Sequence, residues 1–255
     1  MLSAVATDID LNGRYRLGTH LRGCGLDLGP GHVPASATVT YVDRWVPDQN
    51  RGLFPELSEA EFPPTDVVAN FDTDRLDPIP TESQDFVICS HVLEHLAEPI
   101  GFIDEIHRVL RFGGNALILL PDRRRTFDRN QDPTSLAHLA AEHKAGVTVV
   151  DDEHVRTFIE KAGDEAQLLE PADGQDLAAF YEMHRNRSIH VHYWAEDEFL
   201  PVLLYGMKRL AQRWTLIDRL HCESDSIEFG FVLQRSGSRS RARTIRRFRD
   251  AWDAL

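Results

Sequence analysis

Short apolar segments, each bounded by turn-forming or acidic residues, run through the first half of the chain. Five of them lie at residues 23–28, 38–42, 66–71, 85–90 and 115–120. One clear helix separates the last two, because Pro99 opens it, apolar residues recur on one helical face as far as Leu110, and Gly113-Gly114 is placed to end it. Short strands that alternate with helices in this way predict an α/β fold with a mostly parallel sheet.

The second half of the chain begins with a different pattern. Residues 123–188 are charged and show helical periodicity at 134–144, 152–162 and 176–185, so we expect a helical insertion that caps the edge of the sheet. A strand at 189–194, a helix at 196–213 and an antiparallel pair of strands at 215–221 and 227–234 follow. The pattern therefore predicts a Rossmann-like, seven-stranded, mostly parallel sheet with an antiparallel last strand and a helical cap insertion.

This pattern divides the chain into four parts. We expect residues 1–122 to form the ligand-binding half of a Rossmann-like core, 123–188 a helical cap that holds the acceptor, 189–234 the remainder of the core, and 235–255 a tail. The tail carries seven arginines up to Arg249, which favours a solvated, partly helical segment, with a phosphate- or partner-binding arm as the alternative.

Composition narrows the class of protein. The 255 residues carry a net charge of −13, which argues against a general affinity for nucleic acid or for an anionic membrane. The three cysteines are widely spaced, as is typical of buried thiols in a reducing compartment. No apolar stretch approaches the ~20 residues needed to span a bilayer, and the N-terminus lacks a basic signal region. We expect a cytoplasmic protein without nucleic-acid or membrane partners, and a homodimer stays open.

Two glycines and two acids mark the first two predicted strands. Asp27 ends the first apolar run, Gly29 and Gly31 follow it, and Asp43 ends the second run. Strand, glycine turn, strand and acid is the arrangement with which an α/β sheet holds a nucleotide-like ligand at its carboxyl edge. Pro34 stands where the third glycine of a dinucleotide fingerprint would be, which argues against a nicotinamide-dependent dehydrogenase. The first crossover must also be very short.

Four segments, in order and spacing, resemble the class I S-adenosylmethionine-dependent methyltransferases (type 11-like). They read G-L-D-L-G-P-G, Y-V-D-R, D-F-V-I-C-S-H-V-L-E-H-L and R-V-L-R-F-G-G-N-A-L-I-L-L-P-D, and they cover residues 20–122. The segments P-D-R-R-R-T-F-D and H-V-H-Y-W are similar to bacterial glycan or sugar O-methyltransferases and, more loosely, to the actinobacterial enzymes that make methylmannose polysaccharide. The resemblance implies S-adenosylmethionine as cofactor, a sugar or oligosaccharide hydroxyl as acceptor, and a place in polysaccharide biosynthesis.

The resemblance also implies roles at the glycine turn. Asp27 would hold the amino end of the cofactor, and Gly29 and Gly31 would let the backbone approach its methionine part, where a Cβ atom would collide. Pro30 between the glycines departs from the commoner family pattern, which leaves the contacts of residues 30–34 open.

Further roles fall at the ends of the later strands. Asp43 would accept hydrogen bonds from both ribose hydroxyls, since a carboxylate can accept from two donors at once. Phe71 and Asp72 would lie against the adenine, with Asp72 accepting from its amino group. Ser90 and His91 would line the floor of the site near the sulfonium.

Methylation of a hydroxyl needs a base close to the acceptor oxygen. Histidine suits that task because its ordinary pKa lies near neutrality, and six of the twelve histidines fall between residues 138 and 192. We expect His143 to be the base, with His192 as second candidate; surface histidines without a role are the alternative for either.

A metal site is a further possibility in this region. His190 and His192 share one face of the strand expected at 189–194, and together with Asp122 they are candidates to hold a divalent cation such as Mg²⁺. Such an ion would orient two sugar hydroxyls and lower their pKa. Loss of activity in EDTA, restored by magnesium, would support it.

Three other functions stay open or are disfavoured. The first two are a methyltransferase of small non-sugar molecules and a non-catalytic module that only binds S-adenosylmethionine. The third is methylation of a nucleic-acid amine, which would require an Asn/Asp-Pro-Pro-aromatic run after the fourth strand. This chain has Ser90-His91-Val92-Leu93 at that place, which disfavours the third function.

Overall fold

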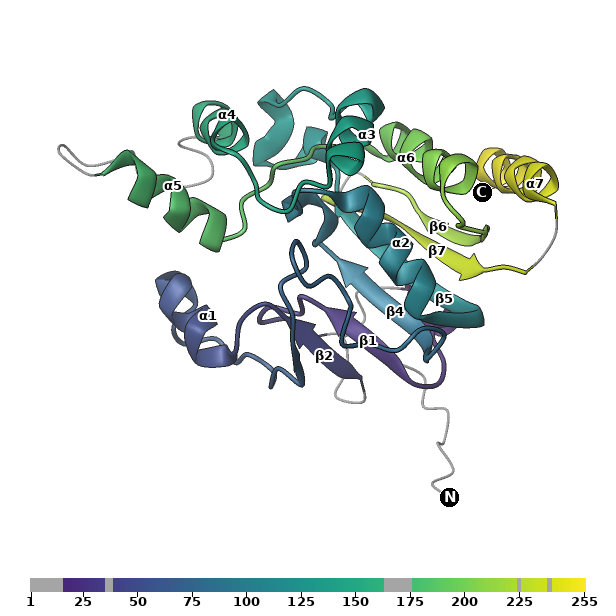
Figure 1. Cartoon of the computed structure of the whole chain (residues 1–255), viewed down its shortest axis with the longest axis horizontal. Coiled ribbons are helices and arrows are strands. Elements are labelled where there is room, and N and C mark those ends of the chain that lie inside the picture. Colours follow the sequence, from purple (N-terminus) through teal and green to yellow (C-terminus); the bar gives the residue numbers. More distant parts are fainter. Residues whose placement is uncertain (1–15, 35–38, 163–175, 224–225, 238–239) are drawn as a thin grey trace, which may run out of the picture.

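The computed structural model describes residues 16–34, 39–162, 176–223, 226–237 and 240–255, and its centre is one twisted seven-stranded sheet (Figure 1). The strands lie in the order β3-β2-β1-β4-β5-β7-β6. Their bounds are β1 Gly25–Leu28, β2 Thr40–Asp43, β3 Val67–Val68, β4 Gln84–Ser90, β5 Leu110–Pro121, β6 Trp214–Leu220 and β7 Glu228–Arg235. The expected start of the second strand at Thr38 lies outside the described residues.

The pairing of the strands confirms the predicted fold class. β1 pairs in parallel with β2 and β4, β2 with β3, and β4 with β5, whereas β7 runs antiparallel to both of its neighbours. The central strands are buried on both faces, which is why they read as continuous apolar runs in the sequence. The carboxyl ends of β1, β2, β3 and β4 consequently meet at one edge of the sheet.

Helices α2 (Pro99–Val109), α6 (Glu196–Arg209) and α7 (Arg241–Ala254) cover one face of the sheet (Figure 1). Their apolar sides and the inward side chains of the strands form the main core, which includes the large buried rings of Phe102, Phe199 and Phe231. On the opposite face, the short η1 (Arg16–His20) contributes Leu17 to a smaller core that contains Phe86 and Leu117.

Helix α2 begins as the sequence predicts and ends differently. Pro99 occupies its first turn, and the Glu98 side chain caps it by accepting from the backbone N–H of Gly101 at 2.8 Å. The helix stops at Val109, and β5 then runs from Leu110 through Gly113, whose φ is +82°. The two glycines therefore lie inside the strand, and the expectation that they cap the helix was wrong.

The segment 189–194 forms no strand of the sheet, which corrects a second expectation. Its backbone is extended, but within the described residues only Trp194 makes an isolated bridge, to Asp122. The N–H groups of Val191 and His192 donate instead to the carbonyl of Glu94, at 2.7 and 3.1 Å. This contact holds the segment against the loop that follows β4.

The arginine-rich C-terminus is a packed helix over residues 241–254, where a solvated tail was the main expectation. Phe248 and Trp252 of α7 are buried in the main core, and the guanidinium of Arg219 lies 4.1 Å from the centroid of the Trp252 ring. The arginines lie on the other sides of the helix, because the apolar positions recur at a spacing of four.

The cap consists of short helices with their own small core. After η4 (Arg123–Arg125) and η5 (Phe127–Asn130) come α3 (Leu136–Ala145), α4 (Asp152–Ala162) and α5 (Leu177–Asn186). Val155 and Phe158 of α4 pack with Ile189 and Val191. The expected cap includes residues 163–175, which lie outside the described residues.

Three short helices in the first half complete the outline. They are α1 (Pro47–Leu53), η2 (Pro55–Leu57) and η3 (Leu93–His95). Of the three cysteines, none of which forms a disulfide, only Cys89 is buried and Cys24 is exposed, so the expectation of three buried thiols was wrong. Among the described residues, no helix combines the length and apolarity needed to cross a bilayer.

Candidate functional site

Two neighbouring cavities open at the carboxyl edge of the sheet. The first cavity, of about 330 Å³, lies over the ends of β2 and β3, and the second, of about 470 Å³, lies over the ends of β1 and β4. They share six lining residues: Gly29, Gly31, Asn50, Phe54, His91 and His95. Because both use the same wall, the two cavities form one depression across four strands.

The glycine turn after β1 forms part of that shared wall. Gly29 and Gly31 have φ angles of +60° and +54°, a left-handed conformation that favours glycine. The N–H of Gly29 donates to the carbonyl of Val42 at 2.8 Å, which ties the turn to β2. A Cβ atom at Gly31 would meet no protein atom within 4 Å, so this glycine leaves open the space that a bound group would use.

Asp43 ends β2 at the floor of the first cavity. Its Oδ1 accepts the backbone N–H of Trp45 at 3.1 Å, and burial raises the pKa of its carboxyl against the lowering effect of these backbone bonds and of the Asn50 side chain. Asn50, on α1, is buried beside it. A carboxylate held in this way can accept two further donors, as a pair of ribose hydroxyls would supply.

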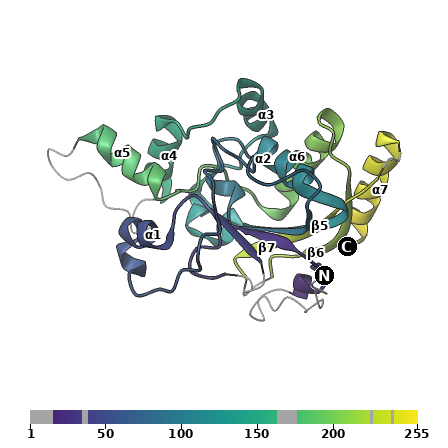
Figure 2. The ribbon, with the colours of Figure 1, turned by 60° about the horizontal axis from the view of Figure 1, so that its bottom comes forward.

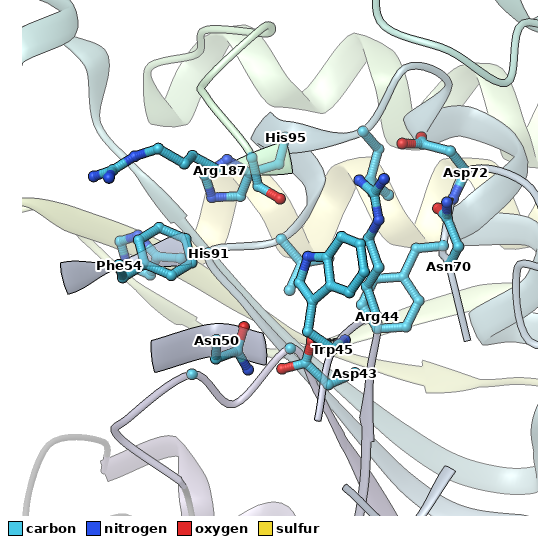
Figure 3. A pocket seen from close by; sticks show the side chains of 16 residues that line it. Asp43, Arg44, Trp45, Asn50, Phe54, Asn70, Asp72, His91, His95 and Arg187 are labelled. Atoms are coloured by element: carbon cyan, nitrogen blue, oxygen red, sulfur yellow. Dashed lines mark hydrogen bonds between the residues drawn. The ribbon is translucent and has the colours of Figure 1, made fainter. Parts of the chain in front are cut away.

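Asp72 lies at the far end of the first cavity. In Figure 3, Asp72 and Asn70 occupy one end, His91 and Phe54 the other, and the ring of Trp45 lies between them. Asp72 Oδ1 accepts the N–H of Ala97 at 2.8 Å, and burial raises the pKa of its carboxyl to about 6. One carboxylate oxygen is thereby directed to the backbone, which leaves the other for a ligand.

His91 follows the last residue of β4 and has a φ of +54°, which is unusual for a residue with a Cβ atom. Its ring lies between two carboxylates: Nε2 donates to Glu228 Oε2 at 2.9 Å, and Nδ1 is 3.5 Å from Glu94 Oε1. A histidine placed between two carboxylates is well suited to carry a positive charge after it accepts a proton.

His95 is the second imidazole that lines both cavities. Its Nδ1 donates to the carbonyl of Ile189 at 3.1 Å, which leaves Nε2 as the acceptor nitrogen of the neutral ring. Burial, together with the neighbouring His190, lowers the pKa of His95 to about 3, so the ring is neutral at pH 7. His95 therefore offers a neutral hydrogen-bonding group to a ligand.

Buried acids lie behind these imidazoles. Glu94 is fully buried, and within the described part of the chain neither oxygen of its carboxylate has a hydrogen-bond partner. Burial raises the pKa of this carboxyl. Asp27, also buried, lines the second cavity. This edge of the sheet thus concentrates carboxyl groups, which favours a cationic ligand.

The residues that follow helix α5 border the first cavity. Arg187, just beyond its end, donates to the carbonyl of Leu53 at 3.0 Å, pairs with Glu56, and lies with its guanidinium 5.1 Å from the Phe54 ring centroid. Both views show α5 over α1 (Figures 1 and 2). The cap and the cofactor side of the sheet are thereby joined across the first cavity.

All eight residues predicted for the cofactor line these two cavities. Gly29, Gly31 and His91 lie in the shared wall, whereas Asp43, Phe71 and Asp72 line the first cavity, and Asp27 and Ser90 line the second. Their individual roles stay predictions. Sequence reasoning missed Trp45, Asn50, Phe54, His95 and Arg187. Of these, only Trp45 could have been found from the sequence, because it follows closely on the acid that ends β2.

The two predicted bases lie outside these cavities, and their role stays a prediction. Nδ1 of His143 lies 3.1 Å from Glu98 Oε1, and its ring packs against Tyr205 on α6. His192 is buried beside the rings of His138 and His154. Neither lines the first or the second cavity. Their place in the sequence near other histidines did not reveal how the cap folds away from the glycine turn.

The three candidates for a divalent cation also diverge. The carboxylate of Asp122 accepts from the guanidinium of Arg124 at 2.7 and 2.9 Å, and His190 Nδ1 lies 2.7 Å from Asp128 Oδ2. His192 faces His138 and His154 instead. The side chains of His190 and His192 contact different groups because residues 189–194 do not form the regular strand that would have placed them on one face.

Comparison with known families gives a match in the first part of the chain. Residues 23–118 match the family model of a methyltransferase domain. The matched segment contains the glycine turn, β1 to β4 and all eight predicted cofactor residues, and the similarity supports S-adenosylmethionine as the methyl donor. The match covers less than half of the chain, and it leaves the cap and the C-terminal strands outside the methyltransferase domain.

Several solved structures are similar to the chain at low sequence identity. A candidate zinc-dependent alcohol dehydrogenase from Rhodobacter sphaeroides is 15% identical, with a TM-score of 0.50 over 87% of this chain and 88% of that one. A candidate type 11 methyltransferase from Sulfolobus solfataricus is 13% identical, with a TM-score of 0.43 over 91% and 96%. The chain spans 48% of the CurJ carbon methyltransferase at 9% identity and a TM-score of 0.42 over 84% of this chain. No curated protein matches the chain.

Proposed function

We propose that the protein is an S-adenosylmethionine-dependent O-methyltransferase that acts on a hydroxyl of a sugar or an oligosaccharide. One observation carries the proposal: His91 and His95 line both cavities, so their imidazoles lie where a donor in the first cavity would meet an acceptor in the second. Methyl transfer to a hydroxyl requires a proton acceptor at such a junction.

The residues of the first cavity fit the donor. Asp43 would accept from the ribose hydroxyls, and Phe71 and Asp72 would contact the adenine. Gly31 leaves room for the methionine part, since a Cβ there would project into open space. When bound, the donor supplies a methyl group activated by a positively charged sulfonium, a charge that the buried Asp27 and Glu94 complement.

We assign the proton transfer to His91. When bound, the donor would supply the methyl group to the acceptor oxygen and leave as a neutral thioether, and the hydroxyl proton would pass to Nδ1 of His91, the nitrogen that does not donate to Glu228. Glu228, at 2.9 Å, orients the ring, and Glu94 helps to stabilise the imidazolium that forms. His95, neutral at pH 7, would hold the acceptor by a hydrogen bond.

The walls of the second cavity suit a carbohydrate. Phe54 and Phe62 offer ring faces against which the C–H face of a sugar can pack, and His32, 6.3 Å from the Phe62 ring between centroids, stands beside them. Ser90 supplies a hydroxyl that can both donate and accept. This mixture of flat apolar and hydrogen-bonding groups supports the acceptor class that the resemblance implies.

An assay with labelled donor against a panel of mono- and oligosaccharides, with phenolic and other small alcohols beside them, tests the proposal. We expect transfer to at least one saccharide, and calorimetric binding of the demethylated donor product by the same protein. Transfer only to a non-sugar compound would replace the acceptor class, and binding without any transfer would indicate a non-catalytic module. Absence of binding would contradict the proposal entirely.

A further inference from the structure

A second group of histidines lies in the cap, outside both cavities described above. Its members are His138 on α3, His154 on α4 and His192 on the extended segment before α6. One ligand atom of each lies within 4.8 Å of the others, and the ring centroids are 5.2, 5.5 and 5.7 Å apart. The three rings, from three separate elements, thus surround one point.

Glu142 adds a carboxylate to the same point. It lies one helical turn after His138, and its Oε1 is 3.0 Å from His138 Nε2 and 3.5 Å from His154 Nε2. Its Oε2 is 3.5 Å from His192 Nε2. Three imidazole nitrogens and one carboxylate are a donor set that Zn²⁺ takes in tetrahedral sites.

The buried groups of this cluster lack partners that proteins normally provide. The His192 side chain is 0% exposed, and among the described residues its ring nitrogens have only weak contacts, to the backbone of Leu96 and Ala97 and, at 3.5 Å, to Glu142 Oε2. Within the same part of the chain, Oε2 of Glu142 is buried and lacks a stronger partner as well. Leaving such buried polar groups without strong partners destabilises the folded protein, and a shared ligand would offset that cost.

The surroundings orient at least one of the rings. Nδ1 of His154 donates to Asp151 Oδ1 at 2.8 Å, which directs its Nε2 toward Glu142 and His138. A carboxylate behind a histidine in this manner is the usual support of a metal-bound imidazole. Ligand nitrogens around zinc lie roughly 3.3 Å apart when Zn–N is ~2.05 Å, and the observed 3.1 Å between the Nε2 atoms of His138 and His154 is close to it.

We propose that His138, Glu142, His154 and His192 form a structural zinc site that fastens the cap to the segment before α6. Four protein ligands complete a tetrahedral shell, and none of them lines the first or the second cavity. The site therefore fixes α3 and α4 relative to the segment that carries His190 and the wall of the cavities. It is independent of the proposed methyl transfer.

Metal binding by the untagged full-length protein tests the proposal directly. After treatment with a chelator and removal of the chelator, we expect the chain to take up about one equivalent of Zn²⁺, measured by mass spectrometry of the metal. Co²⁺ in its place should give the intense visible bands of tetrahedral coordination. The midpoint of thermal unfolding should rise with zinc and not with magnesium.

Three variants and a control locate the site. His138→Ala is the main variant because the His138 side chain is 43% exposed and its loss leaves the core intact. We expect it to lower zinc affinity more than about 100-fold, Glu142→Gln at least ~10-fold, and Asp151→Asn about 10-fold through its support of His154. His20→Ala, on η1, should bind as the wild type does.

Two results would overturn the zinc site. One is a wild-type protein that takes up neither Zn²⁺ nor Co²⁺. The other is His138→Ala and Glu142→Gln variants that bind both ions as tightly as the wild type, which would place the metal elsewhere. Since metal content and the cobalt spectrum are read without any turnover, failure of the methyl-transfer assay would leave this test unaffected.

Discussion

Two groups of histidines meet the segment at residues 189–194, and they differ in what surrounds them. His91, His95 and His190 lie with Glu94 at the carboxyl edge of the sheet, where two of the three rings border both cavities. His138, His154 and His192 lie with Glu142 in the cap, where His192 is buried and His138 is partly open to solvent. The residue types are the same in both groups.

What separates the two groups is where their rings are directed. At the sheet edge, the strand ends and the glycine turn leave open space next to the imidazoles, so a ligand can reach them. In the cap, the rings converge on Glu142. His138 and His154 also border two cavities of about 350 and 150 Å³, but these share no lining residue with the first or the second cavity. We therefore expect chemistry at the first group and structural support at the second.

The largest expected effect is that of His91→Ala. If this variant kept its activity, the assignment of the chemistry to the first group would be wrong. Loss of the proton acceptor should lower kcat by about 10²–10⁴-fold, while binding of the demethylated donor product changes little, because the adenosine contacts remain. Turnover by single-turnover assay and binding by calorimetry separate the two. His143→Ala, in a residue that lines neither cavity, is the matched comparison; a larger loss in that variant would return the base to the cap.

Asp43→Ala should act on binding. Removing a carboxylate that accepts two ribose hydroxyls costs about 1.5–3 kcal/mol per charged hydrogen bond, so we expect the affinity for the donor to fall by at least ~100-fold. Asp48→Ala, an exposed acid on the neighbouring helix, serves as control. Equal affinities in the two variants would show that the first cavity does not hold the nucleoside.

A matched pair of glutamines sharpens the comparison between the groups. Glu94→Gln should lower kcat about 10-fold, because the imidazolium at His91 loses one of its two carboxylates, and should leave zinc affinity unchanged. Glu142→Gln should lower zinc affinity. Measuring kcat and zinc uptake for both variants decides whether the groups are functionally separate. A Glu94→Gln variant that loses zinc would show that the two groups depend on each other.

The smallest effect concerns pH. The pKa of Asp72 is raised to about 6 by burial, so its carboxylate is ionised at pH 7 and gains a proton below pH 6. Donor affinity should therefore fall roughly 10-fold between pH 7 and pH 5. In Asp72→Asn the affinity should be low at both pH values, since the amide would direct its NH₂ toward the adenine amino group while its oxygen keeps the Ala97 N–H.

The same shift gives a stability control. Because the folded protein binds the Asp72 proton more tightly than the unfolded chain, the carboxylate destabilises the folded state as pH rises through 6. Without donor, Asp72→Asn should unfold at a higher temperature than the wild type at pH 8 and at a similar one near pH 4. A wild-type donor affinity independent of pH would contradict the assignment of Asp72.

Most of the fold was predictable because it rests on local patterns. Apolar runs with Gly or Pro between them located β1, β2, β4, β5 and the β6–β7 pair, and Pro99 located the start of α2. The pattern failed where two states look alike locally. Gly113-Gly114 resembles a helix cap but lies within a strand. In the arginine-rich tail, two aromatic residues, Phe248 and Trp252, are too few to predict a packed helix.

The candidate site divides in the same way. Asp27, Gly29, Gly31 and Asp43 lie near one another in sequence at the ends of adjacent strands, so pattern alone brings them together. The imidazoles do not follow from pattern. His143 and His192 lie in a histidine-rich part of the sequence, but the fold of the cap directs His143 to Glu98 and His192 to His138, away from both cavities.

The sequence by itself therefore determined the sheet, the glycine turn and the acids at the strand ends, because strand period and turn chemistry are local properties. Only the tertiary structure decided which histidines line the cavities at the glycine turn and which converge on Glu142. Those side chains come from elements up to 54 residues apart, from His138 to His192, and their meeting depends on how the cap helices pack. Local patterns carry no information about such packing.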